Sequence, residues 1–562
     1  MQTSATSPKT GKSQSKPVTA SSLCAMFLLA ALFLISCKKD KPAPQPEPEP
    51  TYTLSVSPAT IQSPATAGLA TTVTIDANAA WTATLPLGFD WIELNKTSGT
   101  GSDALQVKVS KDNTSGAART AVITVALTNG KAPAKTITVN QDVAVTAPVS
   151  IEWKKVLGGN GNDYGYSLIK TPDGGYLLSG RTSSNGSGDV PASNGGIDML
   201  VLKLDAAGAI TWQKTYGGNA DEYSVSAAAT PDGGYVLTGY TTSSNNGDVG
   251  LNHGATDFWV VKINSSGVLQ WQKTLGGTGE DRPNAVTVTT EGRIAVAGYT
   301  SSTNGDVGAN HGNDDLWVML LDNGNGNFLW KKTFGGNGSE SARALAPAPD
   351  GGVYVGGTTS SSNNGDAGPS KGNADFWVLQ LDRNLSIVWK NSLGGTNIEE
   401  LNALVPGPDH TLIAAGSTKS SGTGDVGPTK GGEDIWVVQL NATTGAMNWQ
   451  KSFGGTGNDV AKGVLVKTDG SLLLAGYSYS DNNGDVGASH GSGDFWILKL
   501  SATGTVAWKK LLGGDNEEQA LAIAASGDTG FAVAGYTLST NSGDVAANHG
   551  NSDIWVLKLK ED

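Results

Sequence analysis

Cysteine, charged residues and long apolar runs are all scarce in this chain. Cys24 and Cys37 are the only cysteines among 562 residues, which excludes a disulfide framework and a cysteine-based metal site. Charged residues account for 16% of the sequence, and 38 basic against 51 acidic residues give a formal net charge of −13. Nucleic-acid binding needs basic stripes that neutralise phosphate, so this balance argues against a nucleic-acid partner.

The apolar run at residues 23–35 is too short for a transmembrane helix. Its 13 residues fall short of the roughly 20 that span a bilayer, but they suit the core of a signal peptide. The run ends in Leu34-Ile35-Ser36-Cys37, which resembles the lipobox of bacterial lipoproteins, whose cysteine thiol takes a diacylglycerol. We therefore predict a lipoprotein signal peptide at residues 1–36 and lipidation of Cys37, with an uncleaved anchor helix as the alternative. The resemblance implies lipid anchoring in the bacterial outer membrane, facing the cell surface or the periplasm.

A spacer and a small β-domain are predicted after this segment. Residues 37–50 hold the lipidated cysteine and a Pro/Glu-rich tract that cannot pack and should be extended. Residues 51–147 contain short segments of alternating apolar and polar residues, bounded by Gly, Pro, Asn and Ser, which is typical of half-buried strands. A segment of about 95 residues suits one immunoglobulin-like β-sandwich.

Residues 52–143, approximately, also resemble the BACON family, which is named as Bacteroidetes-associated and carbohydrate-binding. The matching features are Trp81, Trp91-Ile92, the Ser98-Gly99 turn, Asn113 followed by Arg119, the Ile123/Val125 strand and a closing Ile137-Val139-Gln141. Asp142 departs from the Gly that is common at this place in the family. The resemblance implies sugar binding, with Trp81 and Trp91 as stacking platforms, whereas residue type alone favours packing of both indoles in the sandwich core.

Residues 148–562 contain one sequence unit seven times. The units begin at Trp153, Trp212, Trp271, Trp330, Trp389, Trp449 and Trp508. Successive tryptophans are 59 residues apart, with one step of 60, and the second unit has strand-like segments at 223–230, 235–242, 257–263 and 269–275. Four strands in a repeat of this length predict the blade of a β-propeller. We therefore predict an all-β protein, an Ig-like β-sandwich followed by a seven-bladed β-propeller.

The ends of the propeller region predict how its ring closes. The last unit stops after its third strand, at 553–559, and the strand at 151–157 precedes the first unit. Pairing these two strands would close the ring without a free edge. The turn from Asp205 to Gly208 before Trp212 resembles the docking pattern of quinoprotein-like propellers, and the whole repeat is similar to short propeller repeats of secreted and surface lipoproteins. A Gly in every second strand indicates a close approach of two backbones: Gly180, Gly239, Gly298, Gly357, Gly416, Gly476 and Gly535.

Three sets of acidic residues recur at the end of the propeller that carries the long loops. The Gly-Asp set is Asp189, Asp248, Asp306, Asp366, Asp425, Asp485 and Asp544. The third-strand set, nine residues later, is Asp198, Asp257, Asp315, Asp375, Asp434, Asp494 and Asp553. The first-strand set, after each Gly-Gly pair, is Asp163, Glu222, Asp281, Glu340, Glu399, Asp459 and Glu518. Between the first two sets lie His253, His311, His490 and His549, with Lys371, Lys430 and Asn194 in the other units.

These loop residues allow three interpretations. The carboxylates cap their own turns, or they bind Ca²⁺, although no bidentate Glu has the expected spacing. In the third interpretation they form a glycan or peptide site, and its predicted binding face is Asp248, His253, Asp257, Asp306, His311, Asp315, Asp485, His490, Asp494, Asp544, His549 and Asp553. We predict no resident metal and no other cofactor, because one His per blade places the imidazoles too far apart for zinc.

Catalysis is disfavoured because it needs an acid and a base in different environments, whereas the repeats supply near-equivalent carboxylates. Arg181, Arg282, Arg343 and His410 break the repeat, but they are scattered along the sequence. We expect a non-catalytic, monomeric binding protein of the cell envelope, with glycan as the first ligand class. The alternatives are a protein-interaction scaffold of an envelope complex and, third, a polysaccharide-processing enzyme.

Overall fold

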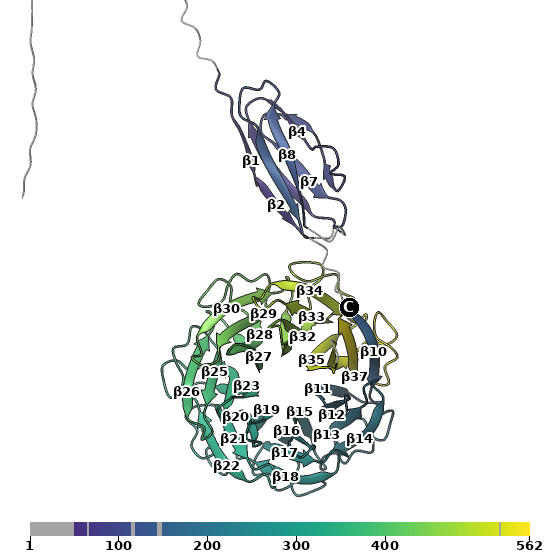
Figure 1. Cartoon of the computed structure of the whole chain (residues 1–562), viewed down its shortest axis with the longest axis vertical. Helices are drawn as coiled ribbons and strands as arrows, with labels where there is room; N and C mark the ends of the chain where they lie inside the picture. The colour runs from purple at the N-terminus through teal and green to yellow at the C-terminus, as the bar shows by residue number, and fades with distance from the viewer. Residues whose placement is uncertain (1–49, 65–66, 114–117, 143–148, 528–529, 562) are drawn as a thin grey trace, which may run out of the picture. The chain divides into compact units, whose positions relative to one another are not determined.

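The computed structural model describes residues 50–64, 67–113, 118–142, 149–527 and 530–561. The elements found in these ranges are all β-strands, numbered β1 to β37, and none of the described residues form a helix that could cross a membrane. The predicted signal peptide and Cys37 lie outside the described residues. The chain divides into two compact units, one holding most of β1–β9 and the other holding β10–β37, and Figure 1 shows both. The all-β prediction is confirmed.

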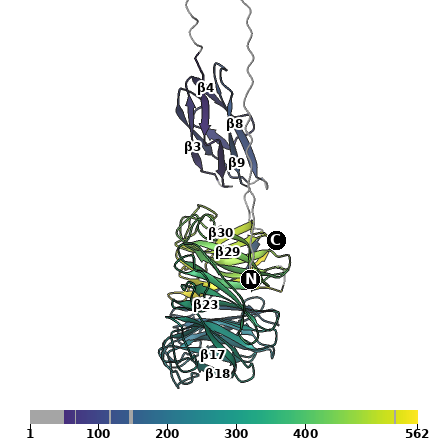
Figure 2. The same ribbon diagram turned by 90° about the vertical axis from the view of Figure 1, so that its left-hand side faces the viewer.

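The first unit is an Ig-like sandwich of two antiparallel sheets. One sheet has the order β1 (Leu54–Ser57), β3 (Ala70–Ala77), β7 (Asp103–Val109), β5 (Ile92–Leu94). The other has the order β2 (Thr60–Ser63), β9 (Lys135–Gln141), β8 (Arg119–Leu127), β4 (Ala80–Thr84), β6 (Ser98–Thr100). Strands of both sheets are labelled in Figure 2. Burial alternates along β3 and β8, because successive side chains of a strand point to opposite faces.

The prediction that Trp81 and Trp91 are sugar-stacking platforms is wrong. Their relative exposures are 0% and 4%, so neither indole offers a free face to a sugar ring. Trp81 lies on the inward side of β4 with Ala83, and its indole N–H donates to the carbonyl of Gly101 over 3.1 Å. Both residues therefore belong to the core of the sandwich.

The second unit is a propeller of seven four-stranded antiparallel sheets. Blade 1 consists of β11 (Asp163–Lys170), β12 (Tyr176–Thr182), β13 (Asp198–Leu204) and β14 (Ile210–Tyr216). Blade 2 consists of β15 (Glu222–Ala229), β16 (Tyr235–Thr241), β17 (Asp257–Ile263) and β18 (Leu269–Leu275). Blade 3 consists of β19 (Asp281–Val288), β20 (Ile294–Thr300), β21 (Asp315–Leu321) and β22 (Phe328–Phe334). Blades 4 and 5 are β23 (Glu340–Pro347), β24 (Val353–Thr359), β25 (Asp375–Leu381), β26 (Ile387–Leu393); β27 (Glu399–Pro406), β28 (Thr411–Thr418), β29 (Asp434–Asn441), β30 (Met447–Phe453). Blades 6 and 7 are β31 (Asp459–Val466), β32 (Leu472–Ser478), β33 (Asp494–Leu500), β34 (Val506–Leu512); β35 (Glu518–Ala525), β36 (Phe531–Thr537), β37 (Asp553–Glu561) with β10 (Val149–Leu157). The first strands, such as β15 and β19, surround the centre, and the fourth strands, such as β18 and β22, form the outer edge (Figure 1).

The seventh blade joins the two ends of the propeller region. Its strand order is β10-β37-β36-β35, and β10 pairs antiparallel with β37, with Ile151 opposite Leu559. Buried side chains from β10, β36 and β37 share one core cluster with side chains of the sixth blade. The outer edge of this blade is thus supplied by a strand from the opposite end of the propeller sequence.

The third strand of each blade lies at the centre of the packing. All seven residues of β17 are buried, because both faces of its sheet are covered by neighbouring blades. One cluster, for example, joins Leu177 and Met199 of the first blade to Tyr235 and Trp259 of the second. A strand that is covered on both faces carries a nearly continuous apolar run, which is how Phe-Trp-Val-Val-Lys-Ile reads here.

The recurring second-strand glycines allow the close backbone approach that their recurrence predicts. A Cβ atom at Gly239 would overlap the carbonyl oxygen of Tyr223 in the adjacent strand, and the same overlap arises at all seven equivalent positions. The register between β15 and β16 shifts beside this point, between Ser224 and Ser226, as at a β-bulge. Glycine is therefore required by the backbone of every blade.

Five of the seven outer-strand tryptophans dock on a turn of the following blade: Trp153, Trp212, Trp271, Trp389 and Trp449. Trp212 donates from its indole N–H to Ser265 over 3.2 Å, and its ring covers Gly267, whose φ is +76°. In the fourth blade Leu385 occupies the equivalent turn position, with φ of +59° and an exposure of 1%. Trp330, which would cover that turn, is 47% exposed. Leucine thus takes the space that tryptophan occupies at the other turns.

Candidate binding site

The first-strand acids anchor the loops that connect neighbouring blades. Glu222 is fully buried, its Oε2 accepts the backbone N–H of Gly218 over 2.7 Å, and its Oε1 accepts the hydroxyl of Thr241 over 2.7 Å. Glu340, Glu399 and Glu518 make the same pair of contacts in their own blades. This set holds each Gly-Gly loop onto its blade and is not open to a ligand.

The Gly-Asp set closes the same loops from the other side. The carboxylate of Asp248 accepts the N–H of Gly217 over 3.2 Å, and its own N–H donates to the carbonyl of Gly217 over 3.0 Å. Asp306 and Asp485 repeat both contacts, and the backbone N–H of Asp544 donates to Gly513. These carboxylates are partly exposed, but their geometry is that of a turn cap.

The third-strand acids cap the ends of the long loops. Oδ2 of Asp257 accepts the backbone N–H of His253 over 2.8 Å and lies 2.8 Å from its Nδ1. The same arrangement occurs at His311 with Asp315, His490 with Asp494, and His549 with Asp553. Where the His is replaced, the N–H of Asn194, Lys371 or Lys430 still donates to the acid. The backbone contact is therefore what the repeat preserves.

The predicted binding face must be corrected at four positions. Asp257, Asp315, Asp494 and Asp553 are fully buried, so they cannot contact a ligand on the surface. The imidazoles beside them remain accessible, with 35–43% of each side chain exposed. The loop residues thus form a hydrogen-bonded frame whose accessible parts are the four histidines and the Gly-Asp carboxylates.

Each junction between blades also holds an unpaired carboxylate oxygen. Within the described residues, Oδ1 of Asp257 and of its six equivalents is buried without a hydrogen-bond partner. Burial raises the pKa of Asp257, and the nearby charge of Asp281 adds to the rise against the lowering effect of His253. Burial, with the charges of Glu222 and Asp248, raises the pKa of Asp198 to about 6. No group of three or more His, Cys, Asp or Glu side chains in the described ranges has the geometry to hold a metal ion.

A second layer of side chains lies closer to the centre of the ring. The residue after each first-strand acid pairs across the sheet with the residue after each second-strand glycine, as Tyr223 does with Tyr240. We call these fourteen residues the inner-rim belt: Tyr164, Arg181, Tyr223, Tyr240, Arg282, Tyr299, Ser341, Thr358, Glu400, Ser417, Val460, Tyr477, Gln519 and Tyr536. They occupy the strands that surround the centre in Figure 1, at the end where the long loops lie.

Blades 7, 1, 2 and 3 contribute a continuous aromatic arc to this belt. The rings of Tyr164 and Tyr536 meet at 4.8 Å between centroids, and those of Tyr223 and Tyr240 stack at 4.5 Å. The guanidinium of Arg181 lies 4.5 Å from the ring centre of Tyr164 and 4.8 Å from that of Tyr223. The rings of neighbouring blades are thus bridged by a cation, an arrangement that cation–π attraction stabilises.

Hydrogen-bonding groups accompany this arc. Arg282 lies 4.7 Å from the ring centre of Tyr240, and burial raises the pKa of Tyr240 to about 12, although Arg282 opposes the rise. The hydroxyl of Tyr240 therefore stays protonated at neutral pH. Tyr536 donates to Oε1 of Glu517 over 2.5 Å, and the Gln519 amide donates to the same oxygen over 2.9 Å.

Blades 4 and 5 give the belt a different character. Their positions are Ser341, Thr358, Glu400 and Ser417, which are small or acidic. Ser417 donates to Oε1 of Glu433 over 2.5 Å. The belt is therefore asymmetric, with an aromatic arc on one side and a polar arc on the other, in contrast to the uniform loop carboxylates.

The sequence shows that four residues break the repeat but does not predict that any of them lie together: Arg181, Arg282, Arg343 and His410. The structure brings Arg181 and Arg282 to opposite ends of the Tyr223–Tyr240 stack. Arg343 is exposed on β23, and His410 lies in a short turn at the other end of the propeller. The signal that could have indicated the belt is variation at the residue that follows each recurring acid or glycine, because that residue differs between blades while the residue before it recurs.

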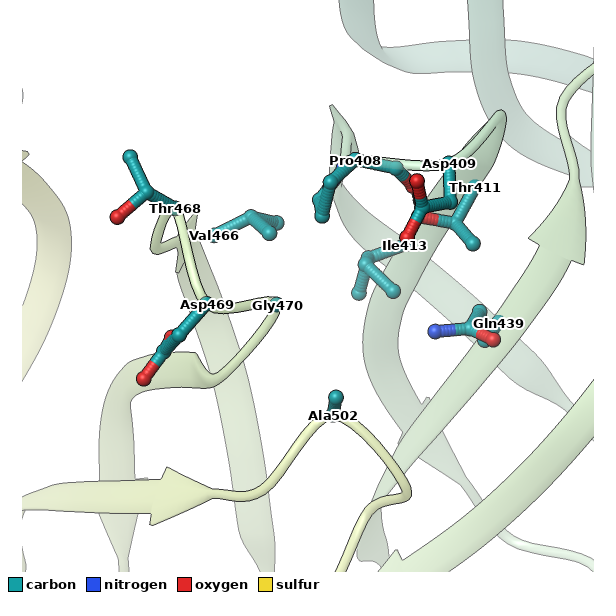
Figure 3. Close-up of a pocket in the computed structure, with 10 residues that line it drawn as sticks. All are labelled: Pro408, Asp409, Thr411, Ile413, Gln439, Val466, Thr468, Asp469, Gly470 and Ala502. Carbon is teal, nitrogen blue, oxygen red and sulfur yellow. Dashed lines mark hydrogen bonds between the residues drawn. The ribbon is translucent and has the colours of Figure 1, made fainter.

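A pocket of about 390 Å³ lies between short turns of the fifth and sixth blades. Figure 3 shows Pro408 and Asp409 on one turn, Asp469 and Gly470 on the next, and Ala502 below. Asp409 and Asp469 are its acidic lining residues, and hydrogen bonds from Ser471 hold the pKa of Asp469 below its usual range. A carboxyl that ionises so readily is unsuited to act as a general acid.

Comparisons with known proteins found one family match and one curated relative. A model of the BACON family, described as a putative N-terminal binding domain, matches residues 88–142. The regulatory protein FlaEY of Caulobacter vibrioides is 24% identical over 374 residues, which are 63% of this chain and 36% of that protein. The chain thus spans about a third of the length of the curated relative it matches.

The solved structures that match the chain are distant from it in sequence and in structure. A quinohemoprotein alcohol dehydrogenase of Comamonas testosteroni is 10% identical, with a TM-score of 0.39 over 74% of this chain and 77% of that one. A quinoprotein alcohol dehydrogenase-like protein of Bacteroides thetaiotaomicron is also 10% identical, with a TM-score of 0.34 over 82% and 96%. A GH5 xyloglucanase of Bacteroides ovatus, solved with a heptasaccharide, is 22% identical, with a TM-score of 0.16 over 22% and 30%. The chain is thus an all-β protein with an N-terminal sandwich, part of which matches a putative binding domain, and a propeller.

Proposed function

We propose that this protein is a non-catalytic glycan-binding protein, anchored by lipid to the bacterial cell envelope, and that the inner-rim belt is its sugar site. The asymmetric arc of tyrosines and arginines is the observation that carries the proposal. A pyranose ring has apolar C–H faces and a rim of hydroxyl groups, so it suits aromatic rings flanked by donors and acceptors. The match of the sandwich to the BACON family supports the same ligand class.

The experiment is a glycan array with the full mature chain, followed by titration of each hit against belt variants. Tyr223→Ala removes one ring of the stacked pair, and we expect affinity to fall about 10-fold or more, because central aromatic anchors dominate binding. Trp330→Ala is the matched control, since Trp330 is an exposed aromatic residue of the outer edge. Equal effects of the two substitutions, at unchanged melting temperature, would reject the belt as the site.

The envelope location needs a separate test because Cys37 lies outside the described residues. Cys37→Ser should leave an unprocessed precursor and abolish labelling with a fatty-acid probe. Retained labelling would show that the resemblance of Leu34 to Cys37 to a lipobox is misleading.

A protein-interaction scaffold is the second candidate function. It is favoured by the outer edge of the third blade, where Leu329 and Trp330 are 42% and 47% exposed, because adjacent exposed apolar residues often mark interaction sites. Cross-linking in intact cells would capture a partner through the outer edge in this case, and Trp330→Ala would abolish the cross-link. A polysaccharide-processing enzyme, the third candidate, would release products from polysaccharides that the array identifies.

A further inference from the structure

Arg181 is a cation without an anionic partner. Three tyrosine rings surround its guanidinium, with centres at 4.5, 4.8 and 5.8 Å for Tyr164, Tyr223 and Tyr166. In the part of the chain that the structure describes, it makes no ion pair with a carboxylate, although the chain as a whole carries a net charge of −13. An arginine that contacts tyrosine side chains and no carboxylate keeps its charge for another partner.

Two other charged groups beside the aromatic arc are already engaged. Arg282 pairs with Glu280 over 3.1 Å. Glu517 accepts hydrogen bonds from Tyr536 and Gln519. The unmatched positive charge of the aromatic arc therefore lies at Arg181, and it is partly exposed.

We propose, on the basis of the proposed glycan function, that the ligand is an acidic glycan and that Arg181 binds the carboxylate of a uronic acid residue. A guanidinium presents N–H donors in a planar fork that matches a carboxylate with two parallel hydrogen bonds. The Tyr223 and Tyr240 rings are stacked on each other between Arg181 and Arg282, so it is their edges and hydroxyl groups that would contact the sugar residue that bears the carboxylate. Arg181 thus recognises the carboxylate, and the tyrosines contact the rest of the sugar residue.

The test compares polymers that differ only at the carboxyl group. Polygalacturonate, alginate and a glucuronan are each paired with a counterpart whose carboxyls have been reduced to alcohols, and polyglutamate supplies carboxylates without sugar rings. The full mature chain should bind at least one uronate polymer about 10- to 100-fold more tightly than its reduced counterpart, as expected for hydrogen bonds to a charged group. This preference should shrink as salt is raised.

The variants assign the preference to one side chain. Arg181→Gln should bring the two affinities within about twofold while leaving binding to the reduced polymer in place. Arg181→Lys should retain part of the preference, because the charge remains and the fork is lost. Arg293→Gln is the control: Arg293 pairs with Glu291 and lies outside the belt, so this change should leave the preference intact.

Each contrary outcome points to a different error. Equal binding of both members of every pair would overturn the acidic-glycan inference and leave glycan binding standing. Binding to polyglutamate as tight as to the uronates would show that charge alone is recognised. A preference that survives Arg181→Gln in a variant with the wild-type melting temperature would place the carboxylate elsewhere. No binding to any of these polymers or to the glycan array would reject the inference together with the proposed function.

Discussion

The loop carboxylates and the inner-rim belt lie at the same end of the propeller, and the repeats treat them in opposite ways. Every blade has the same acid after the long loop, and in every blade a backbone N–H donates to it. The belt position after the second-strand glycine is Arg, Tyr, Thr or Ser, depending on the blade. Each blade must close the same loops, so the loop carboxylates recur in every blade. A ligand at the centre would meet all blades at once, so the belt residues need not be the same in each blade.

Constant and variable positions of a repeat protein serve different needs. A residue that is identical in seven blades satisfies a need that each blade has by itself, and here that need is backbone hydrogen bonding. A residue that varies inside an otherwise constant frame is free of that need. Substitutions that act on the loop carboxylates and leave the inner-rim belt unchanged, or the reverse, test this distinction.

The largest effect is expected at the second-strand glycines. In Gly239→Ala the new methyl group would overlap the carbonyl of Tyr223, so the bulge must deform, and we expect a loss of about 3 kcal/mol or more. Gly233→Ala in the same hairpin is the control, because its Cβ meets nothing within 4 Å and only its φ of +81° is unfavourable; it should cost about 1 kcal/mol. Chemical denaturation measures both, and similar losses would contradict the close-approach argument.

Substitution of a third-strand acid should have a smaller effect that depends on the replacement. Asp257→Ala leaves the N–H of His253 without its acceptor, at a cost of about 2 kcal/mol. Asp257→Asn keeps an acceptor and removes a charge next to Asp281, so it should lie within about 1 kcal/mol of the wild type. Melting temperatures with EDTA and with added Ca²⁺ serve as the control. A rise of many degrees with Ca²⁺ in the wild type alone would favour a metal site over capping.

Stability should also depend on pH in the direction set by these buried acids. Burial raises the pKa of Asp198 to about 6, and it also raises the pKa values of Asp257, Asp281 and Asp315. An Asp in the unfolded chain has a pKa of about 3.9. At pH values between about 3.9 and the raised pKa of the folded protein, the folded state therefore binds more protons than the unfolded state. The contribution of these acids to the free energy of unfolding is therefore fully present below about pH 4, and it is lost as the pH rises through about 6.

We expect the melting temperature to be a few degrees higher at pH 5 than at pH 7.5. Asp198→Asn should reduce this difference, because the amide does not titrate. A melting temperature that falls steadily from pH 7.5 to pH 5 would mean that other groups govern acid stability.

The period of the repeat was enough to predict the fold class, and the backbone need at Gly239 was visible in its recurrence. For Trp81 the residue type favoured the core and the family resemblance implied a sugar platform, and its inward place in an alternating strand with Ala83 decides for the core. The belt could not be predicted, because Arg181 and Tyr223 are 42 positions apart in the sequence and meet only when two blades pack. Variation among repeats hides such a site from any search for recurring residues.

The smallest effect is expected at Leu385, which tests whether variation alone marks function. This residue departs from the glycine of the other turns and takes a left-handed conformation, which costs leucine about 1 kcal/mol. Leu385→Gly removes this strain and lets the indole of Trp330 pack on the turn, but it also removes the packing of the buried leucine side chain. We expect these effects to offset each other within about 1 kcal/mol, and the ring of Trp330 to become protected from solvent. Fluorine NMR with fluorotryptophan, assigned through Trp330→Phe, reports the protection directly, and a resonance that stays solvent-accessible would contradict the exchange of leucine for tryptophan. Because the turn lies at the outer edge and the belt surrounds the centre, glycan affinity should not change, so this departure from the repeat should have no part in the proposed glycan site.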